Sequence, residues 1–167
     1  LYLWTGNCSL LVYDTGADSF LSPILVGAQT SHVAYNHHNG LLYLVGYERN
    51  TVNLVELDAA RGIVLRRAEC RVDGEIAVNP ARNELWQART SYPASFLAVF
   101  PCSTLQYQSY ISVPHAFGRM AVDSTRNKVY CIGAWVTVVD CSSRAVIREI
   151  DAGLGASVSS YFDEFHG

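Results

Sequence analysis

Short runs of apolar residues, interrupted by polar turn segments, follow one another along the whole chain. Several runs alternate apolar and polar positions, as in Val136-Thr137-Val138, and β-branched and aromatic residues are frequent in them. Turn signals such as Asn39-Gly40 and Asn79-Pro80 punctuate the runs. No stretch carries the helical period of about 3.6 residues. The pattern predicts an all-β chain of short antiparallel strands.

A repeat organises these strands. In three segments an Asn or Asp ends an apolar run, and an aromatic residue follows it seven positions later. The Asn and Asp landmarks are Asn36, Asn79 and Asp123, and the aromatic residues are Tyr43, Trp86 and Tyr130. The landmarks are 43 and 44 residues apart. A constant internal offset carried at a constant outer period predicts copies of one structural unit.

Each copy continues with a second apolar run, a polar turn and a last strand. The apolar runs are 54–58, 96–101 and 136–140, and a fourth run, 10–14, lies 44 residues before the first of these. Last strands are expected at 20–26, 63–68, 105–113 and 145–150. Asp14, Asp58 and Asp140 close three of the runs. Their recurrence favours a structural role, in which each carboxylate accepts N–H groups of the following turn.

Four antiparallel strands in about 43 residues form the blade of a β-propeller. We therefore predict an all-β propeller with four blades in this chain and a single domain over residues 1–167. The expected blades are 1–27 together with 156–167, 28–71, 72–113 and 114–153. A small sheet with two apolar faces must stack on its neighbours, which explains why only 16% of the residues are charged.

Three arrangements of the blades remain open on the sequence. Residues 156–167 have the pattern of a first strand, which would pair with the N-terminal strands and close a ring of four blades. In the second arrangement the chain is part of a larger propeller. In the third, terminal strands are exchanged between two chains, which gives a homodimer.

The repeat resembles that of the YVTN-type propellers, a group related to the quinoprotein-like and NHL-type propellers. The likeness rests on Ile76 to Pro80, Asn127 to Tyr130 and Val136 to Asp140, and it extends over nearly the whole chain. The tetrad that names the group is matched poorly, as at Tyr43-Leu44-Val45-Gly46. The resemblance implies a propeller that serves mostly as a binding platform and in a minority of cases as an enzyme. It also implies a secreted or cell-surface location.

Composition excludes several classes of function. Twelve Lys and Arg against fifteen Asp and Glu give a net charge of -3, so no basic excess is present for nucleic-acid binding. No apolar run approaches the roughly 18 residues that membrane insertion requires. The five cysteines include no C-x-x-C pair, which excludes zinc ribbons and thioredoxin-like motifs. We expect them to be small buried hydrophobic residues, with room for one disulfide.

The first strands of propeller blades line the central channel, and binding sites commonly sit at its mouth. The residue four positions before each landmark should occupy the same place in every blade. These channel positions are His32, Glu75, Arg119 and Ser159. The set suits one asymmetric ligand or a group of waters, and Glu75 and Arg119 would neutralise each other. One His does not supply the three protein ligands of a catalytic metal, so we predict neither a metal nor a cofactor.

One stretch departs from the repeat. Residues 89–95 form a longer connection between second and third strands than the counterpart in the last blade, Gly133-Ala134-Trp135. Loops on a rigid scaffold often carry binding, and Tyr, Trp and Arg are typical contact anchors. Arg89, Tyr92 and Trp135 are therefore candidate contact residues.

The sequence favours a non-catalytic binding or scaffold module that contacts a protein or a glycan through loops at one face. No G-x-S-x-G, H-E-x-x-H or phosphate-loop motif is present, so we do not expect catalysis. One alternative is an enzyme or ligand-binding propeller with a site at the channel mouth, around His32, Glu75 and Arg119. Another alternative is an architectural repeat of a surface or secreted protein.

Overall fold

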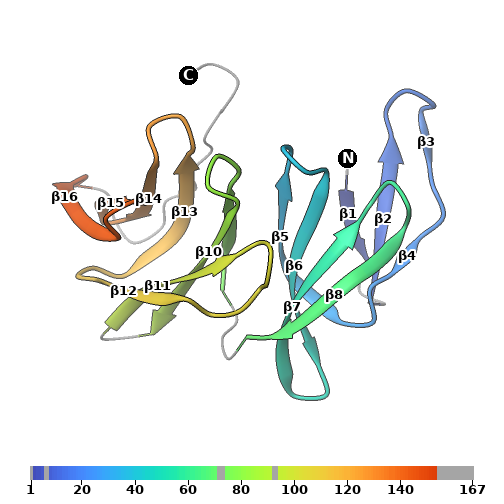
Figure 1. Ribbon diagram of the computed structural model, residues 1–167, viewed down its shortest axis with the longest axis horizontal. Coiled ribbons are helices and arrows are strands. Elements are labelled where there is room, and N and C mark those ends of the chain that lie inside the picture. The colour runs from blue at the N-terminus through green and yellow to red at the C-terminus, as the bar shows by residue number, and fades with distance from the viewer. Residues whose placement is uncertain (1, 6–7, 71–73, 92–93, 154–167) are drawn as a thin grey trace. The chain divides into compact units, whose positions relative to one another are not determined.

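The chain folds into strands and turns (Figure 1). The computed structural model describes residues 2–5, 8–70, 74–91 and 94–153. Within these ranges there are four antiparallel sheets and no helix, so no helix in them is long and apolar enough to cross a membrane. The chain divides into two compact units, Leu1–Asp73 and Gly74–Gly167, which are described separately.

Unit 1 contains the first two sheets. The first sheet comprises β1 (Tyr2–Thr5), β2 (Ser9–Asp14), β3 (Ser19–Phe20) and β4 (Ile24–Leu25). The second sheet comprises β5 (Gln29–Asn36), β6 (Leu41–Glu48), β7 (Thr51–Asp58) and β8 (Ile63–Glu69), each strand paired with the next.

The outer strand of the first sheet is interrupted. A continuous strand is expected over 20–26, but β3 and β4 pair with opposite ends of β2. Pro23 lies between them and lacks the N–H that a continuous ladder requires. The first sheet therefore has three strand positions side by side: β1, β2 and an outer strand that is broken into β3 and β4.

Unit 2 contains the third and fourth sheets. The third sheet comprises β9 (Ile76–Asn79), β10 (Glu84–Ser91), β11 (Ala94–Pro101) and β12 (Ser109–Val113). The fourth comprises β13 (Phe117–Asp123), β14 (Lys128–Gly133), β15 (Trp135–Asp140) and β16 (Ala145–Asp151). Both are meanders of neighbouring strands, and the first strands β9 and β13 lie side by side.

The expected last strand at 105–113 begins later, at Ser109. The Leu105 N–H donates to the Pro101 carbonyl at 2.9 Å, and Leu105 has a positive φ of 54°. This turn delays the strand. The same place in the other turns holds Asp18, Gly62 and Arg144, which also have positive φ values. The four turns are therefore copies of one structure.

The recurring aspartates act as predicted. Asp14 accepts the N–H groups of Gly16 and Ala17, and Asp58 accepts that of Arg61 at 3.0 Å. Asp140 accepts the N–H groups of Ser142 and Ser143 at 3.0 and 2.8 Å. These contacts confirm the role of turn acceptor that the recurrence indicates.

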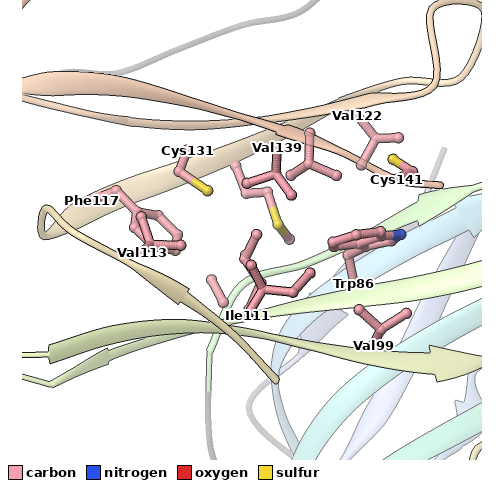
Figure 2. Packing of buried hydrophobic residues seen from close by; sticks show 13 residues of the cluster. Trp86, Val99, Ile111, Val113, Phe117, Val122, Cys131, Val139 and Cys141 are labelled. Atoms are coloured by element: carbon pink, nitrogen blue, oxygen red, sulfur yellow. The ribbon is translucent and has the colours of Figure 1, made fainter. Parts of the chain in front are cut away.

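Each unit has its own hydrophobic core between two sheets. In unit 1, Leu10, Val12 and Ile24 of the first sheet pack with buried residues of the second. Their partners on the second sheet are Leu42, Leu44, Val55 and Leu57. In unit 2, Trp86 of the third sheet lies in a cluster with Cys131 and Val139 of the fourth (Figure 2). Trp86, the aromatic residue of the repeat, therefore packs between the two sheets of unit 2.

The sheets are β-propeller blades, four in this chain. The second, third and fourth sheets are meanders of four strands, as in a blade, and every sheet lies inside one of the four sequence ranges given above. Residues 156–167, the expected closing strand, lie outside the described residues. The closed ring and the single domain therefore stay predictions.

Candidate functional site

The candidate residues gather at one end of each sheet. In an antiparallel meander the first strand begins where the second ends and the third begins. The segment that enters a sheet therefore lies beside the turn between its second and third strands. We call this the entry end of a sheet.

The predicted channel residues occupy one repeated place at the entry end. His32 pairs with Val45 in β6, and Arg119 pairs with Ile132 in β14. The Glu75 carbonyl accepts the N–H of Ala88 in β10 at 2.7 Å. All three lie four residues before their landmark, and bulges precede His32 and Arg119. The equivalence of the positions is thus observed, whereas the central channel itself stays a prediction.

Glu75 and Arg119 form an ion pair in unit 2. Arg119 Nη1 lies 3.6 Å from Glu75 Oε1, and the Met120 N–H donates to Glu75 Oε2 at 2.6 Å. Glu75 is half-buried, whereas the Arg119 side chain is 51% exposed. The carboxylate therefore holds the guanidinium at the surface, where it keeps donors for a ligand. His32 belongs to unit 1, and Ser159 lies outside the described residues.

The predicted contact residues are mainly strand residues. Arg89 lies within β10, paired with Phe96, rather than in a long loop over 89–95. Trp135 is the first residue of β15. Tyr92 lies outside the described residues. The long loop is an error of the sequence interpretation, because the backbone pairing of β10 and β11 continues to Ser91 and Ala94.

A stacked pair of rings lies at the entry end of the fourth sheet. The rings of His115 and Trp135 are 4.6 Å apart between centroids and inclined by 10°. Glu149 Oε2 of β16 lies 3.8 Å from His115 Nε2. All three side chains are at least partly exposed. Sequence reasoning missed His115 and Glu149, because the cluster joins the segment before β13 to β15 and β16, which follow much later in the chain.

Small residues allow the entry segment to approach the second strand. A Cβ at Gly133 would lie 2.6 Å from the Ala116 carbonyl oxygen, and one at Gly46 would lie 2.9 Å from the Ala28 Cβ. In the third sheet, the position equivalent to Gly46 and Gly133 is occupied by Arg89. There the close approach is made by Gly74, whose Cβ would lie 1.7 Å from the Ala88 carbonyl oxygen. With the glycine in the entry segment, the second strand can carry the larger Arg89 side chain at this place.

The buried thiols nearby are poor nucleophiles. Burial, reinforced by the charge of Glu75, raises the pKa of Cys131 to about 12. Burial also raises the pKa of Cys141 to about 11. Both thiols are protonated at neutral pH, whereas thiol catalysis needs the thiolate. Among the described residues no three His, Cys, Asp or Glu side chains form a group able to hold a metal ion.

The sequence matches no family model and no curated protein. Among solved structures, hydrazine synthase from Kuenenia stuttgartiensis is similar, with a TM-score of 0.70 and 14% identity. The match covers 85% of this chain and 42% of that chain, so this chain spans less than half of the protein it matches. Hydrazine synthase has propeller domains, and the likeness supports the propeller-like fold.

Proposed function

We propose that this chain is a non-catalytic binding module, in which the entry end of the fourth sheet contacts a protein or a glycan. The stacked pair His115 and Trp135 carries the proposal. An indole held by stacking loses little conformational entropy on binding, and Trp and Arg dominate contact energies at interfaces. Arg119, which forms an ion pair with Glu75, adds a cationic group at the entry end of the same sheet.

The chemistry of the site favours binding over catalysis. Four of the five thiols are buried, and burial raises the pKa values of Cys131 and Cys141, which keeps both in the poorly nucleophilic protonated form. An active site at the channel mouth around His32, Glu75 and Arg119 is less well supported, because Glu75 is already engaged by Arg119 and by the Met120 N–H. The resemblance to YVTN-type propellers and a secreted or surface location stay predictions.

Binding is tested by screening the purified chain against a glycan array and a displayed random-peptide library. For the tightest ligand of either screen, we expect Trp135→Ala and Arg119→Ala to weaken binding by about tenfold or more each. The control variant is Tyr110→Ala, which removes a half-exposed aromatic residue from β12. A ligand that loses affinity only with Tyr110→Ala would contradict the proposed site, and absence of any ligand would contradict the proposed function.

A further inference from the structure

Two carboxylates flank the stacked rings of His115 and Trp135 on one face of the fourth sheet. Strand register pairs Trp135 with Asp151 and Thr137 with Glu149. Because side chains two residues apart along a strand share a face, these four residues form one patch at the entry end. The ring of His115 lies 4.6 Å from that of Trp135, and Glu149 Oε2 lies 3.8 Å from His115 Nε2. The indole therefore has two carboxylates beside it.

The charge of this patch is not balanced by the cationic residues of the same sheet. Its described strands contain Arg119, Lys128 and Arg148, which the register places on the opposite face. Arg119 is also engaged by Glu75. His115 adds a positive charge only when it is protonated. Glu149 and Asp151 are both exposed, so their charge is available to a ligand.

A buried hydroxyl in the patch has no partner. Thr137 is 1% exposed, and its Oγ1 forms no hydrogen bond. Such a group destabilises the fold, so a buried polar atom without a partner points to a role outside folding. Thr137 lies directly across from Glu149 and on the same face as Trp135. The patch therefore offers a ligand two carboxylates, a hydroxyl oxygen and an aromatic ring, a set that suits a cation with several N–H donors.

We propose that the patch of Trp135, Thr137, Glu149 and Asp151 binds an arginine side chain of a partner protein. This partner class rests on the proposed function and narrows its ligand from a protein or a glycan to a protein with an exposed arginine. A guanidinium is planar, stacks on aromatic rings and pairs with carboxylates through five N–H donors. Charge complementarity favours it over a neutral glycan, and an acidic glycan would be repelled.

The test compares two probes of nearly the same shape, N-acetylarginine amide and N-acetylcitrulline amide, of which only the first is charged. Each is titrated into the ¹⁵N-labelled chain at pH 8, where a histidine side chain is ordinarily neutral. The indole N–H resonance of Trp135, assigned by its loss in Trp135→Phe, is followed. We expect a saturable shift with the arginine probe alone. Equal shifts with both probes, or no saturable shift with the arginine probe, would overturn the proposal.

Variants then test the groups of the patch with the arginine probe. Glu149→Gln and Asp151→Asn should each weaken its binding by about threefold or more, because each removes one carboxylate charge. The matched control is Glu69→Gln, which changes an exposed carboxylate on β8 and should leave the affinity unchanged. An equal loss in the control would show a general effect of charge, which would overturn the assignment to this patch.

Thr137→Val separates a binding role from a structural one. It removes the unpaired hydroxyl and nearly keeps the shape of the side chain, so the free energy of unfolding in urea should stay the same or rise. The affinity for the arginine probe should nevertheless fall by about threefold or more, the loss expected for one hydrogen bond to a charged group. An unchanged affinity would overturn the role assigned to this hydroxyl.

The peptide and glycan screens described above distinguish failure of this proposal from failure of the proposed function. Peptides that bind through Trp135 should contain arginine, and replacing that arginine by citrulline should weaken them by about tenfold or more. A ligand without arginine that depends on Trp135 would overturn the arginine assignment and leave the proposed function standing. Absence of any ligand would contradict the proposed function, and the titration with the two probes then decides on the patch by itself.

Discussion

At the scale of single residues, the landmarks are buried polar groups, and the side chains of Asn36 and Asp123 find partners in the following turn. Asp123 is buried, and its carboxylate accepts hydrogen bonds from the Thr125 hydroxyl at 2.7 Å and the Arg126 N–H at 2.9 Å. Asn36 likewise accepts the His38 N–H at 3.0 Å. The constant offset from landmark to aromatic residue made these positions predictable, because one turn geometry recurs in each copy.

Asp123 makes stability depend on pH in a defined direction. Burial alone would raise the pKa of this carboxyl, but the hydrogen bonds from Thr125 and Arg126 and the Arg126 charge outweigh burial and lower it. Its ionised form therefore stabilises the fold above the unfolded pKa of about 3.9, and that contribution is lost as pH falls through the folded pKa.

For Asp123→Asn we expect a loss of about 1–2 kcal/mol in the free energy of unfolding at pH 7. The difference from the wild type should shrink as the pH falls below about 4. Urea unfolding at several pH values measures both. A difference that is the same at pH 7 and pH 3 would show that the charge of Asp123 is not what stabilises the turn.

Other residues could not be placed from the sequence. His115 and Trp135 are twenty positions apart and lie in no repeated pattern, so their stacking depends on how the entry segment packs on β14. Arg89 is in a strand rather than a loop because its neighbours continue the ladder to β11. Repetition indicates what the copies share, whereas a binding site differs between copies.

At the scale of elements, the entry segment of the fourth sheet depends on Gly133. A methyl group at this position would meet the Ala116 carbonyl oxygen at 2.6 Å and the Phe117 Cα at 3.0 Å, both backbone atoms. We expect Gly133→Ala to cost about 1–3 kcal/mol and to displace His115 from Trp135. Gly118→Ala is the matched control, since no atom lies within 4 Å of its Cβ position. Urea unfolding and near-ultraviolet circular dichroism of Trp135 read both effects, and equal behaviour of the two variants would refute this account.

The contact between the third and fourth sheets also includes a polar clamp. Glu84 is nearly buried and lies 2.9 Å from Arg144 and 3.1 Å from Arg82. We expect Glu84→Gln and Arg144→Met to cost about 1–3 kcal/mol each, with a coupling of about 0.5–3 kcal/mol in the double variant. Asp58 pairs with Arg61, whose side chain is 75% exposed, and this pair should show a coupling of about 0.5 kcal/mol or less. Additive losses at Glu84 and Arg144 would mean that the clamp adds nothing beyond its separate parts.

Strand boundaries show where sequence patterns stop being informative. The third strands were predictable because a run and a closing Asp recur, whereas β12 begins after a turn that Leu105 joins with a positive φ. The break between β3 and β4 follows from Pro23, which lacks an N–H for the ladder. The bulges before His32 and Arg119 were not part of the sequence interpretation.

At the scale of the whole molecule, the repeat predicted four sheets but not their division into two units. The sequence repeat reflects only the features that neighbouring copies have in common. The grouping of sheets depends instead on contacts among side chains that vary from copy to copy, such as the clamp of Glu84 and Arg144.

The cysteines report on the two cores in the intact chain. All five are free, and only Cys8 is partly exposed. Cys131 and Cys141 are buried in one core cluster, with pKa values raised to about 12 and 11. Because a thiol reagent needs an accessible thiolate, we expect Cys8 alone to react in the native protein at pH 8 and all five after unfolding.

Labelling kinetics followed by mass spectrometry then measure how the core of unit 2 opens. Val129→Ala removes two methyl groups from the cluster that holds Cys131 and Cys141, so it should speed the labelling of both by a similar factor. One opening reaction exposes both thiols if the two sheets separate as a whole. Faster labelling of Cys141 alone would show that the turn after β15 opens while the sheets stay packed, and the single core assigned to unit 2 would then be wrong.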